Sequence, residues 1–396
     1  LPVRDVVSWS ALITGYAEIG LDEETFLCLE GLKSDGLTPD CITLVGSLKA
    51  CANARSLDRG LKIHSEIVEL GSEPDPIIGY SLVEMYAKCA SFIEARRVFD
   101  KLPSRDVVSW TVLMVGYTEN NLGQEALECF DEMQQEGVLP DAVTFVCSLK
   151  ACGIAGDVKI GKEMHAKIVL EGFEGNHVIC NVLVDMYATL GCLEEAQNVF
   201  EEMSDVRDVI SWNILIESYV EHGLGEDALA CLPNMQSEGL TPNVTTFTSS
   251  LKACSILGDV DRVQDLLVEI VIRGLEKDQF VTNSLVDAFG RCGSFTEARN
   301  FFEEMQPVED TVSWNILISS YVEHGFVNEV IASLEHMQEK GIGKDAFTCV
   351  SSLKSFGSIG DIARVLNMHM EIINYGFQNN VFIENSLVEA YLKCGY

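Results

Sequence analysis

The chain repeats itself at a fixed period, and no other feature constrains its fold as strongly, because each repeat of a solenoid packs only against its neighbours. Three types of segment recur in a fixed order. Type 1 begins with VVSWSALITGYAEIG or a close variant, type 2 carries SLKAC or a variant, and type 3 carries LVEMYAKC or a variant. Copies of types 1 and 2 are 35 residues long, and complete copies of type 3 have 31 or 32. The repetition predicts a single tandem array.

The array fills the chain. The type 1 repeats span residues 6–40, 107–141, 209–243 and 311–345; the type 2 repeats span 41–75, 142–176, 244–278 and 346–380; the type 3 repeats span 76–106, 177–208 and 279–310. Residues 1–5 match the end of a type 3 repeat, and residues 381–396 match its beginning. Both termini are therefore expected to lie inside truncated repeats, and the lack of a visible targeting segment carries no information.

Each repeat is expected to fold as two helices. In residues 107–141, Trp110, Leu113 and Tyr117 are spaced as one apolar stripe of a helix. After a break, Ala126 and Phe130 begin a second stripe. Neither helix can bury its stripe alone, so the pairs must stack on one another. The pattern predicts an all-α fold, a right-handed α-solenoid superhelix of tandem helix-turn-helix repeats.

Composition and cysteine spacing narrow the class of protein. Hydrophobic residues make up 47% of the chain, yet no apolar run approaches the roughly 18 to 20 residues that a membrane helix needs. Cys51, Cys152 and Cys254 recur at equivalent repeat positions, which is typical of packing, and no C-x-x-C pair occurs. We expect no metal site, no cofactor and no catalytic constellation, so the sequence does not predict an enzyme.

Longer phrases carry a family resemblance. VVSWSALITGYAEIG, SLKACANARSLDRGLKIHSEIVELG and LVEMYAKCASFIEARRVFDKLPSRDVVSW resemble the plant-type pentatricopeptide repeat family, specifically its PLS subclass, and the similarity covers essentially the whole chain. Types 1, 2 and 3 correspond to the P, L and S motifs. The resemblance implies modular recognition of single-stranded RNA, one base per repeat, read by two or three side chains.

The resemblance also implies a biological setting. It suggests an adaptor in RNA editing, processing or stability, located in a chloroplast or mitochondrion. Editing or processing proteins are implied as partners, and DNA and membrane are not. In some relatives an editing deaminase domain follows the array, which would place such a domain beyond Tyr396.

The family reads a base with the residue after the aromatic of the VVSW-type start and with the last residue of the motif. In type 1 repeats these pairs are Ser10 with Asp40, Thr111 with Asp141, Asn213 with Asn243, and Asn315 with Asp345. In type 3 repeats they are Tyr80 with Asp106, Asn181 with Asp208, and Asn283 with Asp310, and Asn385 stands at the reading position of the truncated repeat. Hydroxyl, amide and carboxylate groups can hydrogen-bond the Watson–Crick edge of a base.

A base order follows from these pairs. The resemblance implies guanine for a hydroxyl with Asp, uracil for Asn with Asp, and a pyrimidine, usually cytosine, for two Asn. From the N-terminus, the predicted order is G, two unread bases, G, one unread base, U, C or U, one unread base, U and U. Tyr80 departs from the pattern. Type 2 repeats are expected to act as spacers, since valine cannot hydrogen-bond a base; their reading positions hold Val45, Val146, Val350 and Thr248, the last of which keeps a polar partner in Asp278.

The net charge and the capping preference of Asp leave alternatives open for the function and for the terminal and lysine positions. The net charge of −34 opposes phosphate binding, for which basic side chains normally supply most of the affinity. The terminal Asp of a motif could be only the N-cap of the next helix. An acidic array would also suit a protein-interaction scaffold with a basic partner. Four equivalent lysines of the type 2 repeats either contact phosphates or pair with carboxylates: Lys49, Lys150, Lys252 and Lys354.

Overall fold

The computed structural model describes residues 5–72, 75–203, 207–304 and 310–396. The repeat fragment expected at residues 1–5 falls outside this part of the chain except for Asp5. All regular elements among the described residues are α-helices, 23 in number. The expected all-α fold of tandem helical repeats is therefore confirmed.

The helices divide into two compact units, residues 1–206 and 207–396. In the first unit, the first helices of successive repeats are α1 (Val6–Glu18), α3 (Cys41–Asn53), α5 (Pro76–Lys88), α7 (Val107–Glu119), α9 (Ala142–Ala155) and α11 (His177–Thr189). The second helices are α2 (Asp22–Ser34), α4 (Leu57–Glu69), α6 (Phe92–Asp100), α8 (Gly123–Gln135), α10 (Val158–Leu170) and α12 (Leu193–Glu202).

The second unit continues the alternation. Its first helices are α13 (Val209–Glu221), α15 (Val244–Leu257), α17 (Gln279–Arg291), α19 (Thr311–Glu323), α21 (Ala346–Ser358) and α23 (Val381–Lys393). Its second helices are α14 (Gly225–Ser237), α16 (Val260–Ile272), α18 (Phe295–Glu304), α20 (Val327–Glu339) and α22 (Ile362–Asn374).

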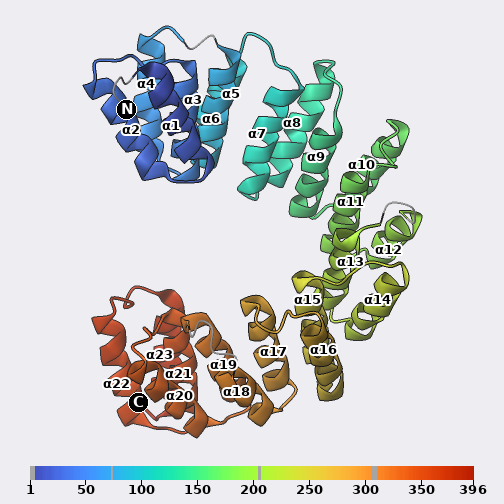
Figure 1. The fold of residues 1–396 in the computed structure, drawn as a ribbon, viewed down its shortest axis with the longest axis vertical. Coiled ribbons are helices and arrows are strands. Elements are labelled where there is room, and N and C mark those ends of the chain that lie inside the picture. Colours follow the sequence, from blue (N-terminus) through green and yellow to red (C-terminus); the bar gives the residue numbers. More distant parts are fainter. Residues whose placement is uncertain (1–4, 73–74, 204–206, 305–309) are drawn as a thin grey trace. The chain divides into compact units, whose positions relative to one another are not determined.

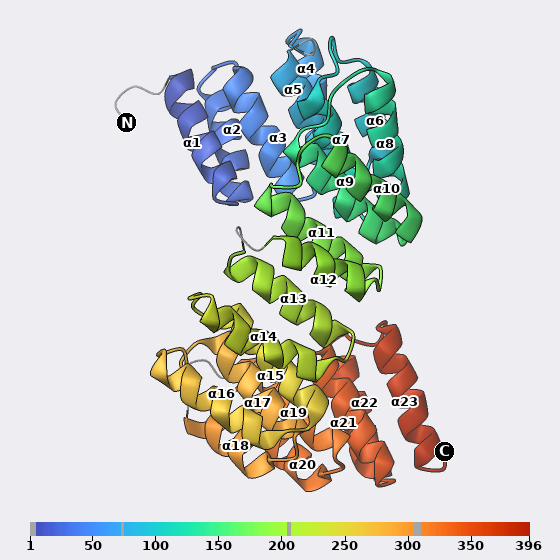
Figure 2. The ribbon, with the colours of Figure 1, turned by 90° about the vertical axis from the view of Figure 1, so that its right-hand side faces the viewer.

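Within each unit the helices form two layers. Each first helix packs against the first helix of the next repeat, as α7 does against α9. Each second helix packs against its own first helix and the one that follows, as α8 does between α7 and α9. Figure 1 and Figure 2 show this alternation in the first unit from two directions. All reading positions predicted from the sequence lie on first helices, hence in the first-helix layer of their own unit.

Capping and a left-handed turn define each helix pair. The first helices begin after an Asp or Asn whose side chain accepts a hydrogen bond from a backbone N–H of the first turn; Asp141 and Asp345 also form a capping box with a Thr three residues on. After the first helix the chain turns through a residue with positive φ. Gly156 adopts a φ of 70° there, and Asn121, the best-tolerated substitute for glycine, adopts 58°.

Buried aromatic contacts fix the register between repeats. Trp110 on α7 is fully buried and meets Phe99 on α6 edge-on, with ring centroids 4.5 Å apart. Trp314 on α19 meets Phe302 on α18 in the same way at 4.7 Å. Each tryptophan anchors a first helix on the second helix of the preceding repeat. Because the reading residue directly follows this anchor, its position along the layer is fixed by packing.

A His–Tyr contact recurs between type 2 and type 3 repeats. The hydroxyl of Tyr187 lies 3.0 Å from Nδ1 of His165, with the rings edge-on. Tyr86 and Tyr391 contact His64 and His369 in the same way. In the third copy the chain carries Leu267 and Phe289 at these positions instead. A polar pair and an apolar pair thus fill the same space, which indicates a packing role.

We predict that the pair His165 and Tyr187 makes stability depend on pH. Burial lowers the pKa of His165 below its ordinary value of 6.5, so the unfolded chain takes up the proton first as the pH falls. The free energy of unfolding that comes from keeping His165 neutral is therefore present above about pH 6.5 and is lost as the pH falls below it. Replacing His165 by Leu together with Tyr187 by Phe should flatten the dependence between about pH 7 and pH 5.

Urea unfolding midpoints across that pH range would measure the effect. The double variant copies the pair that the chain already uses at Leu267 and Phe289, so its packing should be tolerated. A variant with the pH dependence of the unaltered chain would show that His165 does not carry it.

Candidate nucleic-acid interface

Three type 1 repeats bring their two predicted reading residues into direct contact. The amide nitrogen Nδ2 of Asn315 donates to both carboxylate oxygens of Asp345, at 3.0 Å each. Nδ2 of Asn213 donates to Oδ1 of Asn243 at 3.1 Å. In the first repeat, Oγ of Ser10 lies 3.0 Å from Oδ1 of Asp40. Residues 30 positions apart in the sequence thus form compact polar pairs on the first-helix layer.

The fourth type 1 pair is linked through an intermediate residue. Oγ1 of Thr111 lies 3.3 Å from Oγ1 of Thr144, which in turn donates to Oδ1 of Asp141 at 2.8 Å. Thr111 gives its own proton to the backbone carbonyl of Val107 at 2.7 Å. The reading residue and the terminal residue therefore share one network without touching directly.

The type 3 pairs differ from one another. The hydroxyl of Tyr80 donates to Oδ2 of Asp106 at 3.0 Å, and burial and this bond raise the pKa of Tyr80. Asn283 is tied to Asp310 through Ser313, whose hydroxyl lies 2.9 Å from an oxygen of each.

The remaining type 3 reading residues are Asn181 and Asn385. Asn181 is buried on α11 in the first unit, and Asp208 caps α13 in the second, so their pairing stays a prediction. Asn385 is exposed on α23.

The type 2 repeats lack such pairs. Val45, Val146 and Val350 are half-buried on their first helices. Thr248 donates its hydroxyl proton to the carbonyl of Thr245 at 3.0 Å, whereas Asp278 uses its side chain to cap α17. The polar pair expected from Thr248 and Asp278 is therefore not joined by a hydrogen bond.

Helix capping and base reading are compatible at the terminal residues. In Asp40 and Asp141 all described side-chain bonds go to Oδ1, which accepts from the backbone and hydroxyl of the following Thr. The second oxygen is left for another donor. Burial acts to raise the pKa of Asp345, but hydrogen bonds from Thr348 and Asn315 outweigh it and hold the pKa below its ordinary value of 3.8. Asp345 is thus a charged acceptor at neutral pH.

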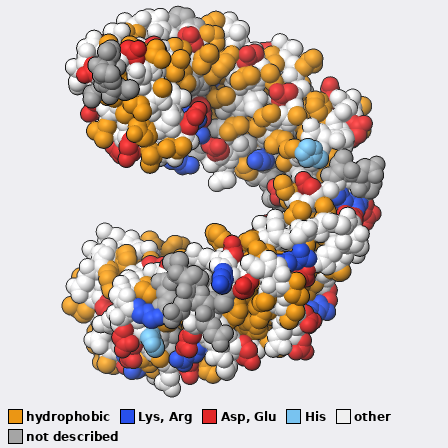
Figure 3. Space-filling model, viewed as in Figure 1, with side chains coloured by type: hydrophobic (Ala, Val, Ile, Leu, Met, Phe, Trp, Pro, Cys, Tyr) orange, Lys and Arg blue, Asp and Glu red, His pale blue; other side chains and the backbone are white. Residues whose placement is uncertain are grey.

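A row of exposed apolar side chains lies beside the reading residues. The second residue of nearly every first helix is Val, Ile or Phe and is at least 47% exposed; these residues are Val7, Ile42, Ile77, Val108, Val143, Val178, Ile210, Phe280, Val312, Phe347 and Phe382. Thr245 stands at this position on α15. Apolar side chains interleaved with acidic ones are spread over the faces seen in Figure 3.

Sequence reasoning missed this row, although a signal was present. The second residue precedes the reading residue by three, which places the two on one face of a helix. An apolar residue that recurs beside a polar one and away from the buried stripe has no role in the core. Such a row offers apolar surface on which a flat base can stack.

One reading residue, Asn315, opens into a cavity. A hollow of about 290 Å³ between α17, α19 and α21 is lined by Asn315, Val312, Phe347, Asp287 and Arg291, with Ile316 and Ser319 completing its wall. An apolar cavity of about 150 Å³ can admit a benzene ring. This cavity therefore has room for a pyrimidine ring between the apolar Val312 and Phe347 and beside the polar Asn315.

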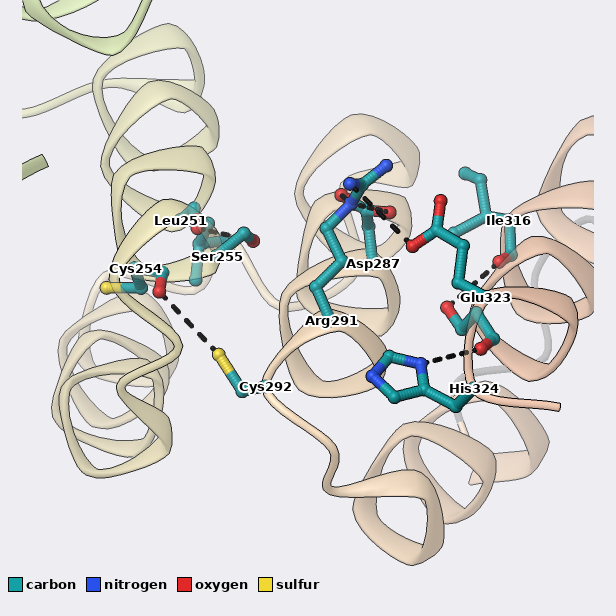
Figure 4. A network of polar contacts seen from close by, with 10 residues as sticks. Leu251, Cys254, Ser255, Asp287, Arg291, Cys292, Ile316, Glu323 and His324 are labelled. Carbon is teal, nitrogen blue, oxygen red and sulfur yellow. Dashed lines mark hydrogen bonds and ion pairs between the residues drawn. The ribbon is translucent and has the colours of Figure 1, made fainter. Parts of the chain in front are cut away.

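Ion pairs neutralise several acidic side chains on the first helices. Glu84 pairs with Lys88 at 3.0 Å, and Glu389 pairs with Lys393 at 2.7 Å. Figure 4 shows Arg291 between Asp287 and Glu323, at 3.0 and 3.9 Å respectively. The pairs between acid and base four residues apart were readable from the sequence and had been overlooked.

The lysines of the type 2 repeats remain available for a ligand. Each lies one turn beyond the reading position of its first helix, and each is exposed. Among the described residues, none of the four, Lys49, Lys150, Lys252 and Lys354, forms an ion pair. Lys354 acts on Glu389 only through a weaker electrostatic effect that helps to lower the pKa of this carboxyl. Contact of these lysines with phosphates stays a prediction, and we call the four residues the lysine row.

The described ranges also bear on metal sites, membrane-spanning helices and reactive thiols. No group of three or more His, Cys, Asp or Glu there could hold a metal ion. No described helix is both long and apolar enough to cross a membrane. Burial raises the pKa of thiols such as Cys129 and Cys152 to about 12, so these cysteines are protonated at neutral pH.

Comparison with known families and proteins gives consistent matches. A family model described as "PPR repeat family" matches residues 105–153 and 207–255, and one described as "PPR repeat" matches residues 7–37, 178–206, 280–306 and 312–342. Together these matches cover more than half of the chain.

Two Arabidopsis thaliana relatives illustrate the similarity. "Pentatricopeptide repeat-containing protein At1g11290, chloroplastic" is 31% identical over 98% of this chain and 48% of its own length. "Pentatricopeptide repeat-containing protein At3g53360, mitochondrial" is 32% identical over 89% of this chain and 46% of its own. The chain thus spans about half the length of these curated relatives.

A solved structure supports the fold. The crystal structure of the pentatricopeptide repeat protein PPR10 in complex with an 18-nt psaJ RNA element aligns with 99% of this chain and 57% of that chain, at a TM-score of 0.52 and 22% identity. At this level of identity the likeness concerns the helical-repeat fold.

Proposed function

The chain belongs to the pentatricopeptide repeat family, and from this premise we propose that it binds single-stranded RNA sequence-selectively, reading one base with each type 1 or type 3 repeat. In this proposal the type 2 repeats act as spacers, so that the array follows the P, L and S order of the PLS subclass. Relatives whose names place them in the chloroplast or mitochondrion support an organellar role in RNA editing, processing or stability.

The contact between Asn315 and Asp345 beside the cavity is the observation that carries the proposal. A base entering the cavity would lie between Val312 and Phe347 and meet the amide of Asn315 at its edge. The carboxylate of Asp345 holds that amide by accepting from its Nδ2. Apolar stacking holds any base, whereas the hydrogen-bonding groups discriminate between bases. The same two elements, an exposed apolar side chain and a polar pair, recur in the type 1 repeats 6–40 and 209–243.

The lysine row supplies the positive charge that the proposal needs. Nucleic-acid affinity depends on cations near the phosphates, and charges beyond a Debye length of about 8 to 10 Å are largely screened. Lys49, Lys150, Lys252 and Lys354 lie on the reading layer, and many of the carboxylates lie on second helices. The net charge of −34 therefore overstates the repulsion that an RNA strand would meet at this layer.

Selection from a pool of short random RNAs tests the proposal. The purified chain is mixed with the pool at about 50 and 200 mM salt, and bound RNAs are sequenced. We expect enrichment of the base order predicted above and weaker binding at the higher salt. Binding without any enriched sequence, or without salt dependence, would contradict the proposal.

A protein-interaction scaffold remains the second candidate because the excess of acidic groups favours a basic partner. The same chain can be tested against short Lys- and Arg-rich peptides. Tight peptide binding without RNA selection would favour the scaffold.

A further inference from the structure

One threonine recurs at the junction between type 1 and type 2 repeats. The third residue of the first helix after each type 1 repeat is Thr43, Thr144, Thr246 or Thr348, and each is fully buried. Its backbone N–H donates to the terminal Asp or Asn that caps the helix. Its side chain also reaches back 33 residues to the reading residue of the preceding repeat, so one buried hydroxyl contacts both members of the pair.

In two repeats this hydroxyl lies against an amide oxygen. Oγ1 of Thr348 lies 2.6 Å from Oδ1 of Asn315, and Oγ1 of Thr246 lies 2.6 Å from Oδ1 of Asn213. An amide oxygen only accepts, so the hydroxyl is the donor in both contacts. Each hydroxyl also lies within donating distance of the capping residue, at 2.8 Å from Asp345 and 3.1 Å from Asn243, so its single proton is shared between the amide oxygen and the cap.

The network leaves one orientation for the amide of Asn315. The carboxylate of Asp345 accepts only, so the group of Asn315 that faces it is Nδ2, and Oδ1 must then face Thr348. The two N–H bonds of an amide diverge widely, so only one of them points at the carboxylate. None of the described residues accepts from the second N–H, and Asn315, which is 6% exposed, lines the cavity.

Asn213 is held in the same way. Oδ1 of Asn243 accepts the backbone N–H of Thr246, which fixes an acceptor opposite Asn213. Nδ2 of Asn213 therefore faces Asn243, and its Oδ1 faces Thr246.

The reading residue Thr111 presents an acceptor and not a donor, and it does so without help from Thr144. Thr111 gives its only proton to the carbonyl of Val107, so its oxygen is left as an acceptor whatever its neighbour does. Its contact with Thr144 is longer, at 3.3 Å.

We propose that Thr348 is a positioning residue that contributes to base specificity, because its hydroxyl, together with the carboxylate of Asp345, holds the amide of Asn315 in the orientation that presents a donor. The inference rests on the RNA-reading function proposed above. A presented N–H suits the carbonyl oxygen of uracil, and it opposes the exocyclic amino group that cytosine carries at the corresponding position. Uracil is selected over cytosine at repeat 311–345 in part through a residue that never touches the base.

The variant Thr348→Val tests the proposal, since valine keeps the shape and removes the donor. Oδ1 of Asn315 would then be buried without a donor, and this cost destabilises the orientation in which the amide presents its N–H. Affinities are measured for short RNAs that follow the predicted order and differ only in the base opposite repeat 311–345. We expect the preference for uracil over cytosine to fall about fivefold or more.

Two controls separate orientation from folding. Thr348→Ser keeps the hydroxyl and should restore the preference. Thr144→Val removes the equivalent hydroxyl beside Thr111, so it should leave the base preference of repeat 107–141 unchanged even if it weakens the helix cap. Thermal unfolding of each variant measures the structural cost independently of base preference.

The outcomes distinguish the two levels of the proposal. If the unaltered chain shows no base preference at this position, the RNA-reading function fails and the inference fails with it. If the unaltered chain prefers uracil and Thr348→Val keeps that preference, only the inference is overturned. Equal loss of affinity for all bases, or an equal change of preference in Thr144→Val, also overturns it, because either result would show a purely structural role.

Discussion

Replacing Asn315 by Thr is expected to change the base preferred at repeat 311–345 from uracil to guanine. Thr111 shows what a threonine does at this position: it donates its proton to the carbonyl four residues earlier and leaves its oxygen as an acceptor. A reader that presented an N–H would then present an acceptor, which suits the donors on the Watson–Crick edge of guanine. A good bidentate contact is worth about 1 to 3 kcal/mol of discrimination, and the change loses one match with U and gains one with G, so the ratio of affinities for U and G should change by about thirtyfold or more.

Equilibrium binding to RNAs that differ only at that base measures this ratio. The reciprocal change, Thr111→Asn, provides the matched control, because it should move the preference at repeat 107–141 from guanine toward uracil. Both variants leave Asp345 and Asp141 in place as helix caps. An unchanged preference in Asn315→Thr, or an equal loss of affinity for every RNA, would remove the base-reading role of Asn315.

Neutralising the lysine row is expected to weaken RNA binding strongly while leaving the preferred sequence unchanged. The variant replaces Lys49, Lys150, Lys252 and Lys354 by Gln. Each lost phosphate contact lowers the dependence of log affinity on log salt by about 0.7 for a single strand, so four contacts account for a change of about 3. At low salt we expect an affinity loss of about a hundredfold, since counterion release supplies much of nucleic-acid affinity.

Titrations at several salt concentrations measure both quantities. A control variant replaces four lysines of second helices or their ends, Lys33, Lys159, Lys162 and Lys340, by Gln, which changes the net charge equally. We expect it to alter affinity much less, because its charges lie on the other layer. An unchanged salt dependence in the first variant, or the same loss in both, would show that the row makes no specific phosphate contacts.

The sequence predicted the helical pairs because repetition and apolar spacing are local signals. The stripe containing Trp110 and Leu113 folds as α7, and both residues are buried. The choice of reading and terminal positions came instead from the family resemblance. Its pairs at Ser10, Asn213 and Asn315 do contact their partners, whereas Thr248 and Asp278 do not share a bond. Their role in reading bases stays a prediction.

Other features of the site could not be read from the chain with certainty. Whether Lys150 would be paired or available depends on which carboxylates the neighbouring helices bring near it. The exposure of Val108 beside the buried Trp110 depends on how closely adjacent first helices pack. Ion pairs such as Glu84 with Lys88 belong to one helix, and their four-residue spacing was sufficient to predict them.

The sequence by itself determined the repeat period, which follows from the recurrence of whole segments, and the all-α fold, which follows from apolar spacings within one or two helical turns. Tertiary structure decided which hydrogen-bonding group, donor or acceptor, each reading residue presents to a ligand. Asn315 is bonded to Asp345 and to Thr348, which lie 30 and 33 residues further along the chain. Only the stacking of one repeat on the next brings these groups together, and buried polar groups must satisfy one another once it does. The direction of an amide is therefore set by neighbours that no local pattern identifies.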